Sequence, residues 1–199
     1  MPACKGCVKV TGLTSLPLLG DYSNTPLMNK MREPINLSEW EKPLKPQGRG
    51  RLFTCGRPGR FTFGREKRII NNETIDQWTH GLPQVECLYI VSLLGRKKNG
   101  YSEFSYYPFR SSKEVGAKPT FQDWLTERYG PRFIVHEFPT VDAMGVPYEI
   151  MKDLMHHIHD LIENGNTVLI MDSAGAERTA RVCEAMGYKR MSRAVARED

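Results

Sequence analysis

The chain has 199 residues, of which 40% are hydrophobic and 26% are charged. This length and composition are typical of a water-soluble protein with one hydrophobic core, or of one domain with an extension. The net charge of +5 fits an anionic ligand without identifying one, and no apolar run approaches the length that spans a bilayer, so we expect no membrane partner.

The N-terminus and the cysteines indicate the compartment. The chain begins without the basic and then apolar pattern of a signal peptide, so we expect a protein that is not exported. Its five cysteines are an odd number, which favours reduced thiols in the cytoplasm. Cys4 and Cys7 have the spacing of half a zinc site, but no second pair follows them and the first histidine is His80. We therefore expect neither a metal site nor a cofactor.

Residues 1–50 differ from the rest of the chain. Prolines recur through them and no period of 2 or 3.6 residues persists, yet the segment contains several leucines and Trp40. It is too apolar for a typical disordered tail. We expect residues 1–50 to form an extended, proline-rich arm that packs along the domain, and residues 51–199 to form that domain.

From residue 51, apolar runs of strand length alternate with segments of helical periodicity. Asn72 is the expected N-cap of the first helix. Such alternation predicts an α/β fold with a mostly parallel central sheet flanked by helices. Ligands of such sheets bind at the carboxyl ends of the strands, and the loop after Met171 lies at such an end. Strands are expected at residues 51–55, 87–94, 133–138 and 167–171, and helices at about 72–82, 120–128, 147–165 and 179–186.

The loop between the last strand and the last helix carries the candidate site. Small side chains at Ser173, Ala174, Gly175 and Ala176 let several backbone N–H groups converge on one point. Such a nest, together with the positive end of the following helix, binds an oxyanion. The loop therefore predicts a phosphate site.

Three residues at the start of the last helix bear on the same site. Arg178 can add a planar fork that grips two phosphate oxygens, and Thr179 can add a hydroxyl. Glu177 either lines the rim, where it would deflect anionic ligands or orient Arg178, or faces solvent at the helix N-terminus. The alternative for the whole loop is an ordinary strand-to-helix turn whose arginine is salt-bridged.

The wider stretch resembles the cysteine-dependent protein tyrosine and dual-specificity phosphatases. Their signature is His-Cys-x5-Arg followed by Ser or Thr, with a small residue and a glycine inside, and this chain has Ala174-Gly175, Arg178 and Thr179. Upstream, residues 137–147 (EFPTVDAMGVP) resemble the general-acid loop of that family, with Asp142 at the acid position. The resemblance covers about residues 51–190. It implies a phosphatase-type fold, a phosphate-binding loop at 173–179, and catalytic positions at Asp172, Arg178 and Asp142.

Two positions depart from the family pattern. Asp172 stands where the family has its nucleophilic cysteine, and Met171 stands where the family has histidine. In the family the loop amides lower the pKa of the cysteine, and its thiolate attacks phosphorus while the acid protonates the leaving oxygen. A carboxylate at position 172 would be stabilised by the same amides and would repel a phosphate dianion. We expect a weakened phosphate site, or one that Asp172 itself occupies.

The favoured interpretation is a catalytically impaired pseudophosphatase that binds a phosphorylated protein or a small phosphate-bearing ligand. One alternative is an active dual-specificity-type phosphatase whose cysteine has been replaced by Asp172, although Met171 argues against a single replacement. Another is an atypical phosphate-processing hydrolase that uses Asp172 as its nucleophile or base. Nucleophilic attack by an aspartate normally relies on bound magnesium and further carboxylates.

A nucleic-acid partner is the most distant alternative. Basic residues interleave with aromatic rings that could stack on bases, at Arg57, Arg60, Phe61, Phe63, Arg65, Lys67 and Arg68. A solvated hairpin accounts for the same cluster, and we prefer it.

Overall fold

The computed structural model describes residues 37–42, 50–60 and 70–191, apart from residues 115, 117 and 143. All of them belong to Arg32–Asp199, one of the two units into which the chain divides. Three features of the sequence lie outside the described residues: the cysteine pair at Cys4 and Cys7, most of the expected arm, and the aromatic part of the basic cluster.

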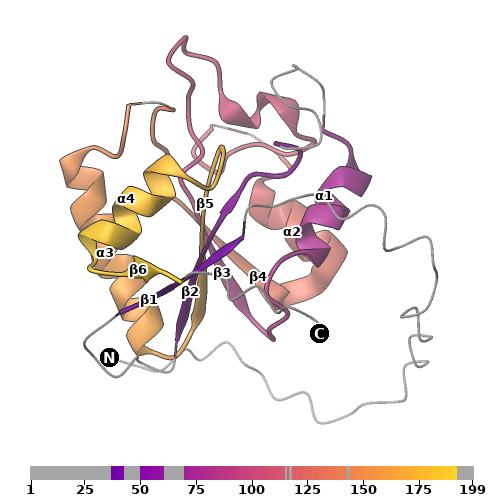
Figure 1. Ribbon diagram of the computed structural model, residues 1–199. Helices are drawn as coiled ribbons and strands as arrows, with labels where there is room; N and C mark the ends of the chain where they lie inside the picture. The colour runs from indigo at the N-terminus through magenta and orange to yellow at the C-terminus, as the bar shows by residue number, and fades with distance from the viewer. Residues whose placement is uncertain are drawn as a thin grey trace, which may run out of the picture. The chain divides into compact units, whose positions relative to one another are not determined.

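A six-stranded sheet runs through the described residues (Figure 1). Its strands are β1 (Ser38–Glu41), β2 (Arg51–Gly56), β3 (Leu88–Ser92), β4 (Phe133–Glu137), β5 (Thr167–Asp172) and β6 (Lys189–Arg190). Their order across the sheet is β4-β3-β5-β2-β1-β6. The first four strands in that order are parallel, whereas β1 pairs antiparallel with both β2 and β6. The sheet is therefore mixed, with the expected parallel centre and an antiparallel edge.

Side chains of the central strands alternate between two hydrophobic cores, because successive residues of a strand point to opposite faces. On β5, Val168 and Ile170 belong to the core on one face, whereas Leu169 and Met171 belong to the core on the other. All four are fully buried. The apolar run at 167–171 is thus a strand covered on both sides, as its continuous hydrophobicity predicts.

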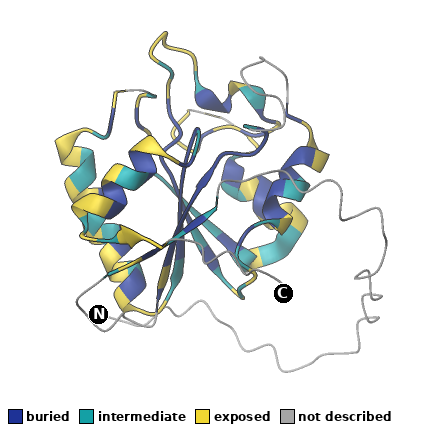
Figure 2. Ribbon diagram, viewed as in Figure 1, coloured by how far each residue is buried: buried dark blue, intermediate teal, exposed yellow. Residues whose placement is uncertain are grey.

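Helices cover both faces of the sheet (Figure 1). They are α1 (Asn72–His80) and α2 (Phe121–Tyr129) on one face and α3 (Tyr148–Glu163) and α4 (Glu177–Ala185) on the other, with short 3-10 helices η2 (Glu103–Tyr106) and η3 (Gly130–Arg132). Figure 2 shows buried strands between helices that are exposed on their outer sides. None of these described helices is long and apolar enough to cross a bilayer.

The N-cap of helix α1 is Asn71, one residue before the expected Asn72. The side chain of Asn71, rather than that of Asn72, accepts a hydrogen bond from the Thr74 N–H group at 2.9 Å. Asn71 has extended backbone angles, whereas Asn72 is already helical. Because asparagine caps a helix well at either position, only the backbone conformation distinguishes the two.

Strand β1 lies within residues 1–50, the expected arm, and pairs with β2. Trp40 is buried in the core beneath α3 and α4, and its Nε1 donates a hydrogen bond to Thr54 Oγ1 at 3.0 Å. Arg51 Nε and Glu39 Oε1 form an exposed ion pair at 2.9 Å across the same two strands. Residues 38–41 are therefore an integral part of the sheet.

Candidate functional site

The loop between β5 and α4 lies at the carboxyl edge of the parallel strands (Figure 1). Asp172 is the last residue of β5, and α4 begins at Glu177. Gly175 has a φ of +66°, and a Cβ atom there would lie 2.3 Å from both the Cys55 carbonyl carbon and the Gly56 nitrogen. The loop is therefore packed directly on the end of β2, and only glycine fits this position.

The Asp172 carboxylate accepts the hydrogen bonds that the loop offers. Its Oδ1 atom accepts from the N–H groups of Ala174 at 2.8 Å and Gly175 at 2.5 Å, and its Oδ2 atom accepts from the Thr179 N–H group at 3.1 Å. Only 2% of the residue is exposed. The small loop residues do bring N–H groups together on one anion, and that anion belongs to the chain itself.

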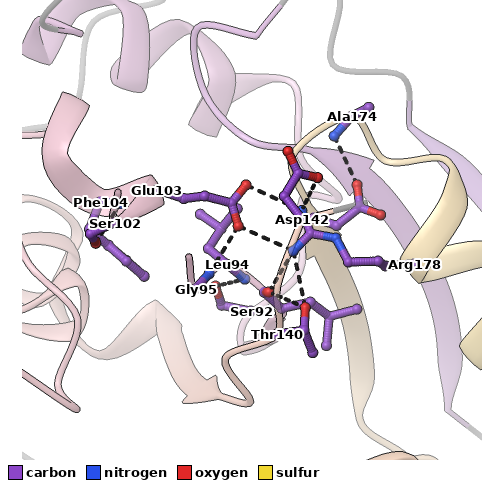
Figure 3. A network of polar contacts seen from close by, with 12 residues as sticks. Ser92, Leu94, Gly95, Ser102, Glu103, Phe104, Thr140, Asp142, Ala174 and Arg178 are labelled. Atoms are coloured by element: carbon purple, nitrogen blue, oxygen red, sulfur yellow. Dashed lines mark hydrogen bonds and ion pairs between the residues drawn. The ribbon is translucent and has the colours of Figure 1, made fainter. Parts of the chain in front are cut away.

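Both terminal nitrogens of the Arg178 guanidinium are engaged by other protein groups (Figure 3). Nη1 and Nη2 donate to the two carboxylate oxygens of Glu103 at 3.1 and 3.2 Å, which is a bidentate pair. Nη2 also donates to Asp142 Oδ1 at 3.1 Å. Nη1 also donates to the Leu93 carbonyl and to Thr140 Oγ1, each at 3.0 Å. The fork that was expected to grip phosphate holds carboxylates in this structure.

Glu103 is the residue of this site that the sequence does not reveal. It lies in η2, is fully buried, and its Oε2 atom also accepts a hydrogen bond from the Gly95 N–H group at 3.0 Å. Glu103 and Arg178 are 75 positions apart, so no local spacing links them. The nearest sequence signal is Ser102, whose side chain caps η2 by accepting from the Phe104 N–H group at 3.2 Å.

Asp142, the expected general acid, is ion-paired with Arg178 and keeps 37% of its side chain exposed. Its backbone N–H group donates to the Arg96 carbonyl at 2.8 Å. Thr140, two positions earlier, donates through Oγ1 to the Leu93 carbonyl at 2.8 Å. These bonds hold the segment against the end of β3. The structure therefore brings Asp142, Arg178 and Asp172 to one edge of the sheet, while their catalytic roles stay predictions.

Three carboxylates act on the Arg178 guanidinium. Burial on its own would lower the pKa of Arg178, but the hydrogen bonds and charge of Glu103, with the charges of Asp172 and Asp142, raise it above its ordinary value. The arginine therefore stays protonated, and its charge is offset within the protein. An incoming anion would therefore meet an arginine whose charge is already offset by carboxylates of the chain.

The remaining loop residues divide between the interior and solvent. Ser173 is buried, whereas Ala176 is exposed. Thr179 is fully buried, and its hydroxyl has no hydrogen-bond partner within the described part of the chain. Glu177 is exposed and pairs with Arg181 at 3.0 Å. Glu177 therefore matches the solvent-facing alternative, because its ion-pair partner is Arg181 and not Arg178.

Three further side chains of nucleophilic or basic character lie in α4, β4 and α3. Cys183 is buried in α4, and burial raises the pKa of its thiol. His136 on β4 and His157 on α3 face each other with ring centroids 4.5 Å apart, and burial lowers the pKa of both. Among residues 37–42, 50–60 and the described part of 70–191, no three His, Cys, Asp or Glu side chains gather to hold a metal ion.

No protein-family model and no curated protein matches the chain. Among solved structures, the chain is similar to kinase associated phosphatase (KAP) in a form whose catalytic-site cysteine is substituted by serine. That similarity covers 78% of this chain and 74% of the other, with 16% sequence identity and a TM-score of 0.48. These values are too low to assign a family or to transfer an activity.

Proposed function

We propose that this protein is a phosphatase-like binding protein, without cysteine-based catalysis, whose phosphate loop is occupied by its own Asp172. The observation that carries the proposal is the set of three N–H donors, from Ala174, Gly175 and Thr179, on the Asp172 carboxylate. In a phosphate-binding loop these are the donors that a phosphoryl group would use. The residue pattern of the loop and of the Asp142 segment supports the same interpretation.

Asp172 is poorly placed to act as a nucleophile. Both of its carboxylate oxygens accept backbone hydrogen bonds, which stabilise the negative charge where it is. Attack on phosphorus would give up that stabilisation and would bring a phosphate dianion against a carboxylate. Two like charges at about 4 Å repel by about 1 kcal/mol in water and by about 4 kcal/mol at an effective dielectric of 20. The geometry therefore supports binding over turnover.

An external phosphate group can enter the loop only if the present contacts change. Asp172 would have to leave its N–H donors, and Arg178 would have to exchange Asp142 or Glu103 for the ligand. A phosphorylated protein or a small phosphate-bearing ligand is therefore expected to bind the loop weakly. Removal of the Asp172 carboxylate should strengthen that binding.

Variants of Asp172 test the proposal with an aryl phosphate and with inorganic phosphate. Neither the wild type nor Asp172→Ala should hydrolyse para-nitrophenyl phosphate, because neither has a thiolate in the loop. Calorimetric titration should show that Asp172→Ala binds inorganic phosphate at least about fivefold more tightly than the wild type, because a like-charge repulsion of about 1–4 kcal/mol is removed. Glu177→Ala is the matched control, since it removes an exposed carboxylate from the same helix end and should change the affinity little.

Other outcomes identify the alternatives. Hydrolysis by the wild type that disappears in Asp172→Ala would show that Asp172 is a nucleophile or a base. Hydrolysis by Asp172→Cys that depends on Arg178 and Asp142 would show a complete phosphatase site that lacks only its cysteine. An unchanged phosphate affinity in Asp172→Ala would overturn the proposal that Asp172 occupies a phosphate-binding loop.

A further inference from the structure

Arg57 is a buried arginine beside the loop, and it forms no ion pair with any carboxylate of the described residues. It follows β2 directly, and its backbone N–H group donates to the Asp172 carbonyl at 2.9 Å. Only 8% of the residue is exposed. Its Nη1 atom donates to the Tyr107 hydroxyl at 3.0 Å and to the Pro58 carbonyl at 3.3 Å. These partners are neutral oxygens.

One buried nitrogen of Arg57 has no acceptor among the described residues. Its Nε atom is buried without a hydrogen-bond partner in the part of the chain that the structure describes. Buried charged groups are normally paired and hydrogen-bonded, because removing an unpaired charge from water is costly. Burial acts to lower the pKa of Arg57, but Tyr107 and the charge of Glu103 raise it above its ordinary value, so the group stays charged. Both oxygens of Glu103 are nevertheless bonded to Arg178.

Lys97 carries a second positive charge, and it contacts the same aromatic ring as Arg57. Its Nζ atom donates to the Tyr106 hydroxyl at 2.8 Å and lies 4.6 Å from the centre of the Tyr106 ring. The Cζ atom of Arg57 lies 5.5 Å from the centre of that same ring. Lys97 is half-buried and, like Arg57, forms no ion pair with the described residues. Each of these two positive charges therefore has the Tyr106 ring as a neighbour, and an aromatic ring offsets a positive charge only in part.

We propose that Arg57 and Lys97 form a second anion-binding site, separate from the Asp172 loop, for a phosphate group. Arg57 supplies planar N–H donors, and Lys97 supplies a point charge beside the Tyr106 hydroxyl. Arg57 differs from Arg178 in this respect, because Glu103 and Asp142 already neutralise the charge of Arg178. The second site accepts its anion while Asp172 remains in the loop, so it does not depend on the proposed function of the loop.

Inorganic phosphate, titrated into the full-length wild-type chain in a calorimeter, tests the second site. Saturable binding is expected, and Lys97→Gln should weaken it about tenfold or more, because one of the two charges near the anion is lost. Lys98→Gln is the matched control, since it removes the same charge from the neighbouring exposed lysine and should bind as the wild type does. Arg57→Gln should also weaken binding, but Lys97 is decisive because a half-buried lysine is safer to replace than a buried arginine.

Three outcomes would overturn the second site. One is the absence of saturable binding to the wild type, and another is an equal loss of affinity in Lys97→Gln and Lys98→Gln, which would indicate diffuse attraction to a basic surface. The third is phosphate binding that appears only in Asp172→Ala and is insensitive to Lys97→Gln, because all the phosphate would then be in the loop. If the loop proposal fails, Asp172→Ala binds phosphate no more tightly than the wild type does. Phosphate binding by the wild type would still depend on Lys97, so failure of the loop proposal can be distinguished from failure of the second site.

Discussion

At the level of single residues, the partners of two charged side chains decide the character of the site. The two oxygens of Asp172 reach N–H groups in both the loop and the first turn of α4. A thiolate offers one acceptor atom there, so a cysteine at this position would leave some of these donors for a ligand. Arg178 forms a buried ion pair with Glu103. The N–H donors around Asp172 and the Arg178 guanidinium are thus both satisfied by groups of the chain itself.

The Glu103–Arg178 pair predicts a large loss of stability in Glu103→Gln. The two side chains are 0% and 3% exposed, and a glutamine amide would leave the arginine charge without its bidentate partner. Removing one member of a buried ion pair costs about 3–5 kcal/mol in the free energy of unfolding. Urea unfolding measures this cost. Glu177→Gln is the control, because it breaks an exposed pair with Arg181 and should cost less than about 1 kcal/mol. An equally small cost for Glu103→Gln would contradict this account of the pair.

At the level of elements, the end of β2 and the loop after β5 form one unit. Gly56 pairs with Asp172 in the parallel ladder and also forms a bridge with Ala174. The next residue, Arg57, donates its N–H group to the Asp172 carbonyl at 2.9 Å. One strand end therefore positions both the loop and the arginine of the second anion site.

The packing of the loop on β2 predicts that Gly175→Ala is more destabilising than an alanine at an open glycine. A positive φ costs a residue with a Cβ atom about 1–2 kcal/mol, and at Gly175 the Cβ atom would also lie 2.3 Å from two backbone atoms of β2. Relief of that overlap should add about 1–3 kcal/mol. Gly100→Ala is the control, because Gly100 has a φ of +86° with nothing within 4 Å. Equal losses in urea unfolding would mean that the loop does not rest on β2.

At the level of the whole molecule, the antiparallel edge completes the sheet beneath α3 and α4. Trp40 from β1 belongs to the same hydrophobic core as Leu154, Ile158 and Val182. Strand β6 follows α4 and pairs with β1. This edge of the sheet therefore joins a strand that precedes β2 in the chain to a strand that follows α4. The expected boundary at residue 51 would separate β1 from its neighbours.

Two shortened chains test the importance of this edge. A chain that begins at Arg32 keeps β1 and is the reference, which should unfold cooperatively in urea. A chain that begins at Arg51 loses the Trp40 side chain, whose burial alone contributes about 2–3 kcal/mol, and exposes the edge of β2. It should unfold at a clearly lower urea concentration or aggregate. Identical midpoints for the two chains would show that β1 contributes nothing to stability.

Features of the fold and of the site could be predicted from the sequence where they depend on neighbouring residues. They could not be predicted where they depend on partners far away in the chain. The buried strand at 167–171 could be predicted from its apolar run, and the loop after it from its small residues and its place at a strand end. Strand β1 could not, because a four-residue segment with two glutamates has little strand preference of its own and depends on β2 and β6. Glu103 could not either, because its role comes only from an arginine 75 positions away.

The Asp172 contacts also determine how the loop responds to its surroundings. A carboxylate tethered within the loop is present at a fixed, high effective concentration, whatever the phosphate content of the solution. The loop therefore has its anion as soon as the chain folds, and its order does not depend on an external ligand. A phosphate that enters must compete with this tethered group, so its apparent affinity is the difference between two binding free energies. The Asp172 loop should consequently be insensitive to ordinary changes in phosphate concentration and respond only to a ligand that gains contacts beyond the loop.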